Sequence, residues 1–194
     1  MALSRREALA SMLAGAFLLP GTGCGAAQAD PSRTLLPPTA SEDFLARCIR
    51  CGRCAEVCTA GCIELHPPWA GAEAGSPFIV PRVAGCNTCT MCTQVCPSGA
   101  LTPIEPEDVL DAVDMGLAYV DEGLCLSFLG RVCGVCHDAC PFPGEAIVLG
   151  HHAQPQVLGA CVGCGRCEER CPQIPAAIRV FRQDPGSPRW KGPA

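Results

Sequence analysis

Residues 161–172 read CVGCGRCEERCP, a run in which four cysteines follow the spacing C-x2-C-x2-C-x3-C and a proline follows the last of them. The same cysteine spacing occurs twice upstream, and a stretched version with seven residues in its first gap occurs once. A repeat of this kind is the first feature that a fold prediction must explain. The four motifs hold all but two of the chain's 18 cysteines: Cys48, Cys51, Cys54 and Cys58; Cys86, Cys89, Cys92 and Cys96; Cys125, Cys133, Cys136 and Cys140; and Cys161, Cys164, Cys167 and Cys171.

The spacing is the signature of bacterial ferredoxins that carry [4Fe–4S] clusters. Two intervening residues let a tight loop place three thiolates on one cubane, and the fourth cysteine lies beyond a turn and binds the cluster of the partner motif. Structural zinc usually takes two separated pairs of ligands, and cysteines three positions apart in a wrapped loop are poor disulfide partners. The spacing therefore predicts four [4Fe–4S] clusters, with zinc and disulfides as the weaker alternatives.

Motifs that are adjacent in the sequence are expected to pair, because a two-cluster ferredoxin unit needs only a short connection between them. The other nesting, in which motif one pairs with motif four, occurs in four-cluster subunits of larger redox enzymes and stays open. Sequential pairing predicts these ligand sets: cluster A with Cys48, Cys51, Cys54 and Cys96; cluster B with Cys86, Cys89, Cys92 and Cys58; cluster C with Cys125, Cys133, Cys136 and Cys171; and cluster D with Cys161, Cys164, Cys167 and Cys140.

The two remaining cysteines are Cys62 and Cys24. Cys62 follows the first motif, in which Thr59 stands where the other three motifs have proline after the fourth cysteine. It is either a small buried residue at the start of a strand or an alternative ligand in place of Cys58, and we favour Cys58. Cys24 is a candidate lipidation site, although Gly21 replaces the usual leucine three positions upstream.

Residues 1–29 are predicted to be a twin-arginine-type signal peptide. Arg5 and Arg6 precede an apolar run that is too short to span a bilayer, and Ala27-Gln28-Ala29 fits a cleavage site. The alternative is an N-terminal helix with a chance arginine pair. Because the twin-arginine route carries folded proteins, it suits clusters that are assembled in the cytoplasm. The expected location is the periplasm or the outer face of the cytoplasmic membrane.

The composition predicts that the clusters supply much of the stability. Aromatic residues are 5% of the chain, and it contains 21 Gly and 19 Pro, so there are few large side chains to fill a core. The expected fold class is α+β, with tandem two-cluster ferredoxin-like modules built from short strands and cluster-binding loops. The expected organisation is a linker at 30–41, a first module at 42–104, a connecting helix at 105–118, a second module at 119–182 and a flexible tail at 183–194. Strands are expected at 63–65, 100–104, 146–149 and 177–181, and the helix at 105–115.

Other functions have little support in the sequence. The net charge of −5 gives no basic footprint for nucleic acid. There is no Ser–His–Asp set and no glycine-rich phosphate loop, and the four histidines (His66, His137, His151 and His152) are not needed as ligands because cysteine ligation is complete. An electron carrier, and not an enzyme, is expected.

The chain resembles the NapG/MauM group of ferredoxin-type proteins. The resemblance is carried by residues 36–38, 44–52 and 116–118, and most specifically by the seven-residue gap between Cys125 and Cys133. It implies a periplasmic carrier that takes electrons from a membrane-bound quinol-oxidising iron–sulfur protein and passes them to a periplasmic redox enzyme or cytochrome. Thr59 departs from the group's usual proline, and Ala8 from the usual phenylalanine of the signal. The alternatives are an iron–sulfur subunit of a molybdoenzyme or hydrogenase complex, and a maturation factor.

Overall fold

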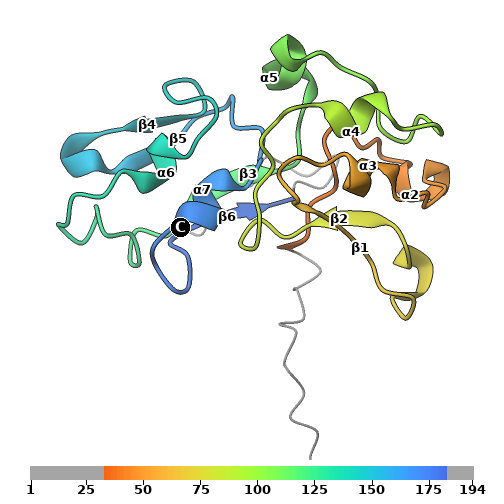
Figure 1. Ribbon diagram of the computed structural model, residues 1–194. Coiled ribbons are helices and arrows are strands. Elements are labelled where there is room, and N and C mark those ends of the chain that lie inside the picture. The colour runs from red at the N-terminus through yellow and green to blue at the C-terminus, as the bar shows by residue number, and fades with distance from the viewer. Residues whose placement is uncertain (1–32, 183–194) are drawn as a thin grey trace, which may run out of the picture.

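The computed structural model describes residues 33–182, which form two lobes joined by a short helical connection (Figure 1). The expected signal peptide at 1–29, Cys24 and the tail at 183–194 lie outside these residues. The first lobe contains α2 (Phe44–Arg47), α3 (Arg53–Glu56), β1 (Ile63–Leu65), η2 (Gly71–Glu73), β2 (Pro77–Ile79) and α4 (Met91–Gln94). The second contains β3 (Leu117–Val120), α6 (Val135–Asp138), β4 (Ile147–Leu149), η4 (His151–Ala153), β5 (Pro155–Val157), α7 (Arg166–Arg170) and β6 (Ile178–Phe181).

The described strands form three antiparallel pairs. The β1–β2 and β4–β5 hairpins fill corresponding places between the two motifs of each lobe, with Ile63 opposite Ile79 and Ile147 opposite Val157. Strand β3 pairs with β6, so the start and the end of the second lobe lie side by side. These small sheets and short helices agree with the expected α+β class.

Each motif forms the same local structure around its third cysteine. The short helices α3, α4, α6 and α7 contain Cys54, Cys92, Cys136 and Cys167 respectively. Each helix is preceded by a residue with positive φ, which is glycine in three cases and Thr90, at 59°, in the fourth. Glycine adopts this conformation at little steric cost. The repeat of the sequence is therefore a repeat of loop and helix.

Two of the expected elements are wrong. Residues 100–104 form no strand and contribute one isolated bridge between Leu101 and Ala40. The N–H of Leu101 donates to Sγ of Cys96 at 3.4 Å, and Pro103 has no N–H to offer a ladder. The helix expected at 105–115 is only η3 (Pro106–Asp108) followed by α5 (Val109–Ala112).

The connecting helix ends early because the chain must reach the second lobe. Val113 is extended, and the N–H of Met115 donates to the carbonyl oxygen of Val162 at 3.1 Å. Strand β3 begins two residues later, within the range expected to be helical. Strands β2, β3 and β5 were not expected from the sequence. Both β2 and β5 begin with proline, which weakens their signal but is tolerated at the first position of a strand.

The described part of the expected linker is extended, but it packs onto the lobes. Leu35 is 1% exposed and exchanges two 2.8 Å backbone hydrogen bonds with Ile79. Its neighbour Arg33 pairs with Glu168 of the second lobe. The segment thus belongs to the core and extends the β1–β2 hairpin.

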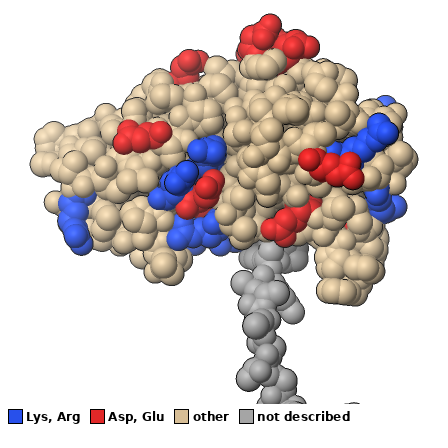
Figure 2. Space-filling model, viewed as in Figure 1, with Lys and Arg blue, Asp and Glu red and all other residues tan. Residues whose placement is uncertain are grey.

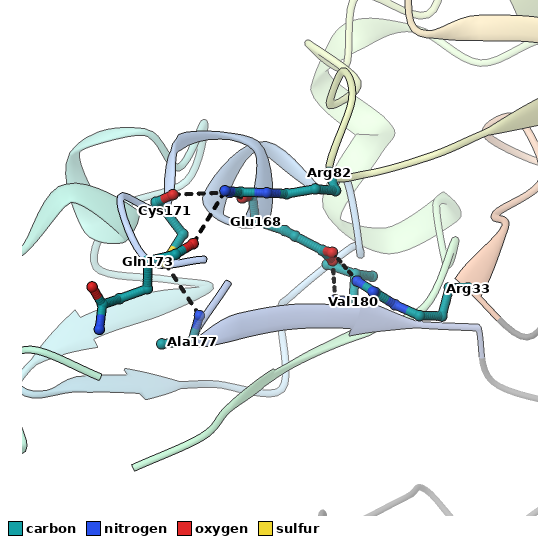
Figure 3. A network of polar contacts seen from close by, with 7 residues as sticks. All are labelled: Arg33, Arg82, Glu168, Cys171, Gln173, Ala177 and Val180. Carbon is teal, nitrogen blue, oxygen red and sulfur yellow. Dashed lines mark hydrogen bonds and ion pairs between the residues drawn. The ribbon is translucent and has the colours of Figure 1, made fainter. Parts of the chain in front are cut away.

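The two lobes are held together by a polar network around Glu168, a fully buried residue of α7 (Figure 3). Its carboxylate pairs with Arg33 and accepts the N–H of Val180 at 2.7 Å. Arg82 of the first lobe donates to the carbonyl oxygens of Glu168 and Cys171 at 2.8 Å and of Gln173 at 3.1 Å. These charge-assisted hydrogen bonds fix the first lobe against the fourth motif.

In the face shown in Figure 2, acidic and basic groups are scattered over a mostly uncharged surface and lie next to one another between the lobes. No helix within residues 33–182 is long and apolar enough to cross a membrane.

Candidate cluster-binding sites

Three small cavities are each lined by one complete set of the expected ligands. The first lobe has a cavity lined by Cys48, Cys51, Cys54 and Cys96, with Phe44, Pro77 and Leu101 behind them. The second lobe has one lined by Cys125, Cys133, Cys136 and Cys171, and another lined by Cys140, Cys161, Cys164 and Cys167. In each cavity, three thiols come from one motif and the fourth comes from the adjacent motif.

The cysteines expected for cluster B also lie together, as contacts between motifs one and two show. Thr59, next to Cys58, donates its hydroxyl to Sγ of Cys89 at 3.5 Å. The pKa of Cys92 is raised to about 12, first by burial and then by the charges of neighbouring thiols that include Cys86, Cys89 and Cys58. The end of motif one therefore lies against motif two.

Burial makes the free thiolate forms unfavourable in these sites. It is the main cause that raises the pKa of Cys54 and Cys136 to about 11 and that of Cys164 to about 12, and neighbouring cysteines raise them further. It also raises the pKa of the buried Cys167 well above its usual value. Buried thiolates repel one another, and a cationic iron core stabilises them. Metal binding therefore releases the protons of the thiols.

Hydrogen-bond donors point at several of the sulfurs. The N–H of Thr88 donates to Cys86 Sγ at 3.3 Å, that of Leu101 to Cys96 Sγ at 3.4 Å, and that of Ala177 to Cys171 Sγ at 3.3 Å. Donors of this kind surround iron–sulfur clusters and help set their potentials. In the second lobe, the buried hydroxyl of Ser127 lines one cavity and has no partner among the described residues. The thiol sets and their donors thus fit iron–sulfur clusters.

No three His, Cys, Asp or Glu side chains within residues 33–182 converge closely enough for a single metal ion. The cysteines instead surround cavities, an arrangement that suits a cluster of several atoms. The histidines have other contacts: His66 stacks on Phe78 at a centroid distance of 4.2 Å, His137 lies 3.2 Å from Asp138, and His151 packs edge-on against His152.

Cys62 is buried beside two of the cysteines expected for cluster B. Its Sγ lies 3.5 Å from Cys58 Sγ, and a side-chain hydrogen bond joins it to Cys86. That hydrogen bond lowers the pKa of Cys86 to about 7 and raises the pKa of Cys62. The pKa values of the two thiols therefore shift in opposite directions, and protonation is favoured at Cys62 over Cys86.

The four sets of cysteines lie in the order A, B, D, C. Cys54 of set A raises the pKa of Cys92 of set B, and Cys136 of set C raises that of Cys167 of set D. Between the lobes, the N–H of Cys86 donates to the carbonyl oxygen of Cys164 at 2.7 Å. An added Cβ on Gly85 would lie 2.6 Å from the nitrogen of Arg166, so the two backbones are in direct contact.

Sequence reasoning missed this junction and Ser127. Only one signal pointed to the junction: Gly85 and Gly165 stand beside cysteines, where backbone can approach backbone closely. Nothing in the sequence distinguishes Arg82 and Glu168 from ordinary surface charges. Ser127 lies inside the seven-residue gap, whose length was noted without a role for its residues.

Comparison with known families agrees with these sites. Profiles described as a 4Fe-4S dicluster domain match residues 47–100, which hold motifs one and two, and residues 117–179, which hold motifs three and four. A third profile of the same description matches residues 85–142 and overlaps both. The tandem two-cluster fold expected from the sequence is thereby confirmed.

Proteins of known family align with most of the chain. The methylamine utilization ferredoxin-type protein MauM of Methylorubrum extorquens is 36% identical, over 98% of this chain and 95% of its own length. MauM of Paracoccus denitrificans is 37% identical over 80% of this chain and 74% of its own length. The ferredoxin-type protein NapG of Escherichia coli is 39% identical over 76% and 70% respectively. The chain therefore belongs to the NapG/MauM family of ferredoxin-type proteins and is an iron–sulfur electron-transfer protein.

Proposed function

We propose that the protein carries four [4Fe–4S] clusters and relays electrons in the periplasm. Cluster A is held by Cys48, Cys51, Cys54 and Cys96, cluster B by Cys86, Cys89, Cys92 and Cys58, cluster C by Cys125, Cys133, Cys136 and Cys171, and cluster D by Cys161, Cys164, Cys167 and Cys140. The observation that carries this proposal is the lining of the three cavities, each of which combines three cysteines of one motif with the fourth of its neighbour.

A bound cluster supplies the one-electron chemistry, and the chain positions and insulates it. Phe44 and Leu101 cover the cavity of set A, and Ala118, Ile147 and Val180 that of set D. Backbone N–H groups, such as those of Thr88 and Ala177, stabilise the thiolate ligands. The protein therefore acts as an electron carrier and not as an enzyme in its own right.

The proposed electron donor is a membrane-bound quinol-oxidising iron–sulfur protein, and the acceptor is a periplasmic redox enzyme or cytochrome. Membership of the NapG/MauM family supports this direction. Relatives named for methylamine utilization and NapG relatives share similar identity with the chain, so the acceptor is proposed by its class.

Export by the twin-arginine route is part of the proposal, and Arg5, Arg6 and the Ala27-Gln28-Ala29 site support it. The mass of the mature chain tests it. Cleavage before Asp30 gives a soluble periplasmic chain, whereas a lipid-modified N-terminal Cys24 identifies a lipoprotein. A full-length chain recovered from the cytoplasm contradicts export.

Electron transfer is tested with the oxidised mature protein under anaerobic conditions. Native membranes and a quinol are added, and the visible absorbance of the clusters is followed. We expect the absorbance to bleach only when both membranes and quinol are present. We then expect it to recover when periplasmic extract is added, because the extract reoxidises the clusters. The controls omit membranes or quinol in turn.

Two outcomes contradict the relay. Fixed-ratio co-purification with a large catalytic subunit, without reduction by membranes and quinol, identifies a subunit of a molybdoenzyme or hydrogenase complex. Binding only to an apo-enzyme, with loss of iron from the carrier, identifies a maturation factor.

A further inference from the structure

Ser127 has a buried hydroxyl without a protein partner. The residue is 1% exposed, and its Oγ has no hydrogen bond among the described residues. Two other buried hydroxyls are satisfied by the backbone: Thr93 donates to Thr90 at 2.8 Å and Ser76 donates to Glu73 at 2.6 Å. A buried hydroxyl left without a partner is unfavourable, so a partner for Ser127 is expected in the loaded protein.

The position of Ser127 indicates what that partner is. It lines the cavity formed by Cys125, Cys133, Cys136 and Cys171, together with apolar residues such as Val120 and Ile178. The described chain supplies no acceptor for the Ser127 hydroxyl. The sulfur atoms of a cluster bound in that cavity would be such acceptors. Hydrogen bonds to such sulfurs are a main determinant of cluster potential.

The stretched loop explains why a side chain is used here. In the three regular motifs, the residue two positions after the first cysteine has positive φ: 58° at Arg50 and Thr88, and 71° at Gly163. At Thr88 this conformation directs the backbone N–H to Cys86 Sγ. Ser127 holds the same position after Cys125 but does not have positive φ.

The loop is fixed by its own turn. The N–H of Leu129 donates to the carbonyl oxygen of Cys125 at 3.0 Å, and that of Arg131 to Leu126 at 2.8 Å. Leu129 and Val132 are exposed, whereas Ser127 is enclosed. The seven-residue gap therefore places one hydroxyl in the cavity, at the position where the second motif has a backbone N–H that donates to Cys86 Sγ.

We propose that the hydroxyl of Ser127 donates a hydrogen bond to a sulfur of the cluster held by Cys125, Cys133, Cys136 and Cys171. This hydrogen bond raises the reduction potential of the cluster. The inference rests on the proposed four-cluster function. A hydrogen bond to sulfur stabilises the more negative reduced state, so losing it lowers the potential.

The test is a redox titration of the mature holoprotein followed by EPR, with iron and sulfide counted in each sample. Ser127→Ala is expected to keep the iron content and to lower one reduction potential while leaving the other clusters unchanged. Ser127→Thr restores the potential. Ser76→Ala is the matched control, because it removes a buried hydroxyl that donates to the backbone and lines none of the three cavities.

A second pair of variants keeps the proposal testable if Ser127→Ala does not fold. Ser127→Thr and Ser127→Val have nearly the same shape and differ in the hydroxyl, so the valine variant should have the lower potential. Equal potentials in the two, at full iron content, overturn the proposal. Iron and sulfide analysis of the unsubstituted protein tests the proposed function separately. A low iron count or bound zinc in that sample refutes the four clusters themselves.

Discussion

The Sγ atoms of Cys58 and Cys62 lie 3.5 Å apart, and Cys62 is also hydrogen-bonded to Cys86. Both neighbours belong to the set expected for cluster B. Cys62 thus lies in hydrogen-bond contact with two of the proposed cluster ligands, and only one of Cys58 and Cys62 is needed to complete the set.

Substitution of the two cysteines should give different results. Cys62→Ala is expected to keep the iron content and to lower the potential of cluster B, because the Cys86 thiolate loses a hydrogen bond. Cys58→Ala is expected to lose or destabilise the cluster. Iron analysis and redox titration of both variants check this. The reverse pattern, with iron lost from Cys62→Ala and retained in Cys58→Ala, makes Cys62 the ligand.

The junction between the lobes should be visible as magnetic coupling. Because Cys86 and Cys164 are joined by a 2.7 Å backbone hydrogen bond, clusters B and D should be neighbours whose unpaired spins interact in the reduced protein. Gly85→Ala would place a Cβ 2.6 Å from the nitrogen of Arg166 and push the lobes apart. This variant is expected to keep its iron and to lose one coupling in its EPR spectrum.

Gly123→Ala is the matched control for this experiment. Its added Cβ would meet only a side-chain oxygen of Asp121, at 3.4 Å, and neither Gly85 nor Gly123 has positive φ. Identical spectra for the two variants would show that the Gly85 contact does not set the distance between clusters.

Arg82 should be important for stability. Its guanidinium donates to three carbonyl oxygens of the second lobe, and hydrogen bonds from charged donors contribute about 1.5–3 kcal/mol each. Because Arg82 is partly exposed and water can replace some of these bonds, Arg82→Met is expected to lower the free energy of unfolding by about 2–4 kcal/mol. Anaerobic urea unfolding of the holoprotein measures it.

The exposed Arg131 provides the control for Arg82. Arg131→Met should change the free energy of unfolding by less than about 0.5 kcal/mol, as surface substitutions usually do. A similar small change for Arg82→Met would mean that the network in Figure 3 does not hold the lobes together.

The sequence predicted the family and the tandem fold because cysteine spacing is a local signal. Cys48, Cys51 and Cys54 must share one loop whatever the rest of the chain does. The hairpin strands were harder to predict. Strand β1 at Ile63–Leu65 was expected, but its partner β2 begins with Pro77 and has only three residues. Short strands of this kind carry too few residues for a clear periodic pattern.

Long-range contacts were beyond the reach of the sequence pattern. The helix expected at 105–115 stops at Ala112 because Met115 bonds to Val162, which lies in the fourth motif. The burial of Glu168 depends on Arg33 and Val180, neither of which is near it in the sequence. Such partners are brought together only by tertiary packing, within the second lobe for Val180 and across the lobes for Arg33.

The most direct test of the account is iron and acid-labile sulfide analysis of the anaerobically purified mature protein, with EPR after reduction by dithionite. The account predicts about sixteen iron and sixteen sulfide per chain, four of each for every cubane, with interacting signals from neighbouring reduced clusters. Zinc without sulfide would contradict the account, because the cysteine sets would then bind a structural metal and could not carry electrons.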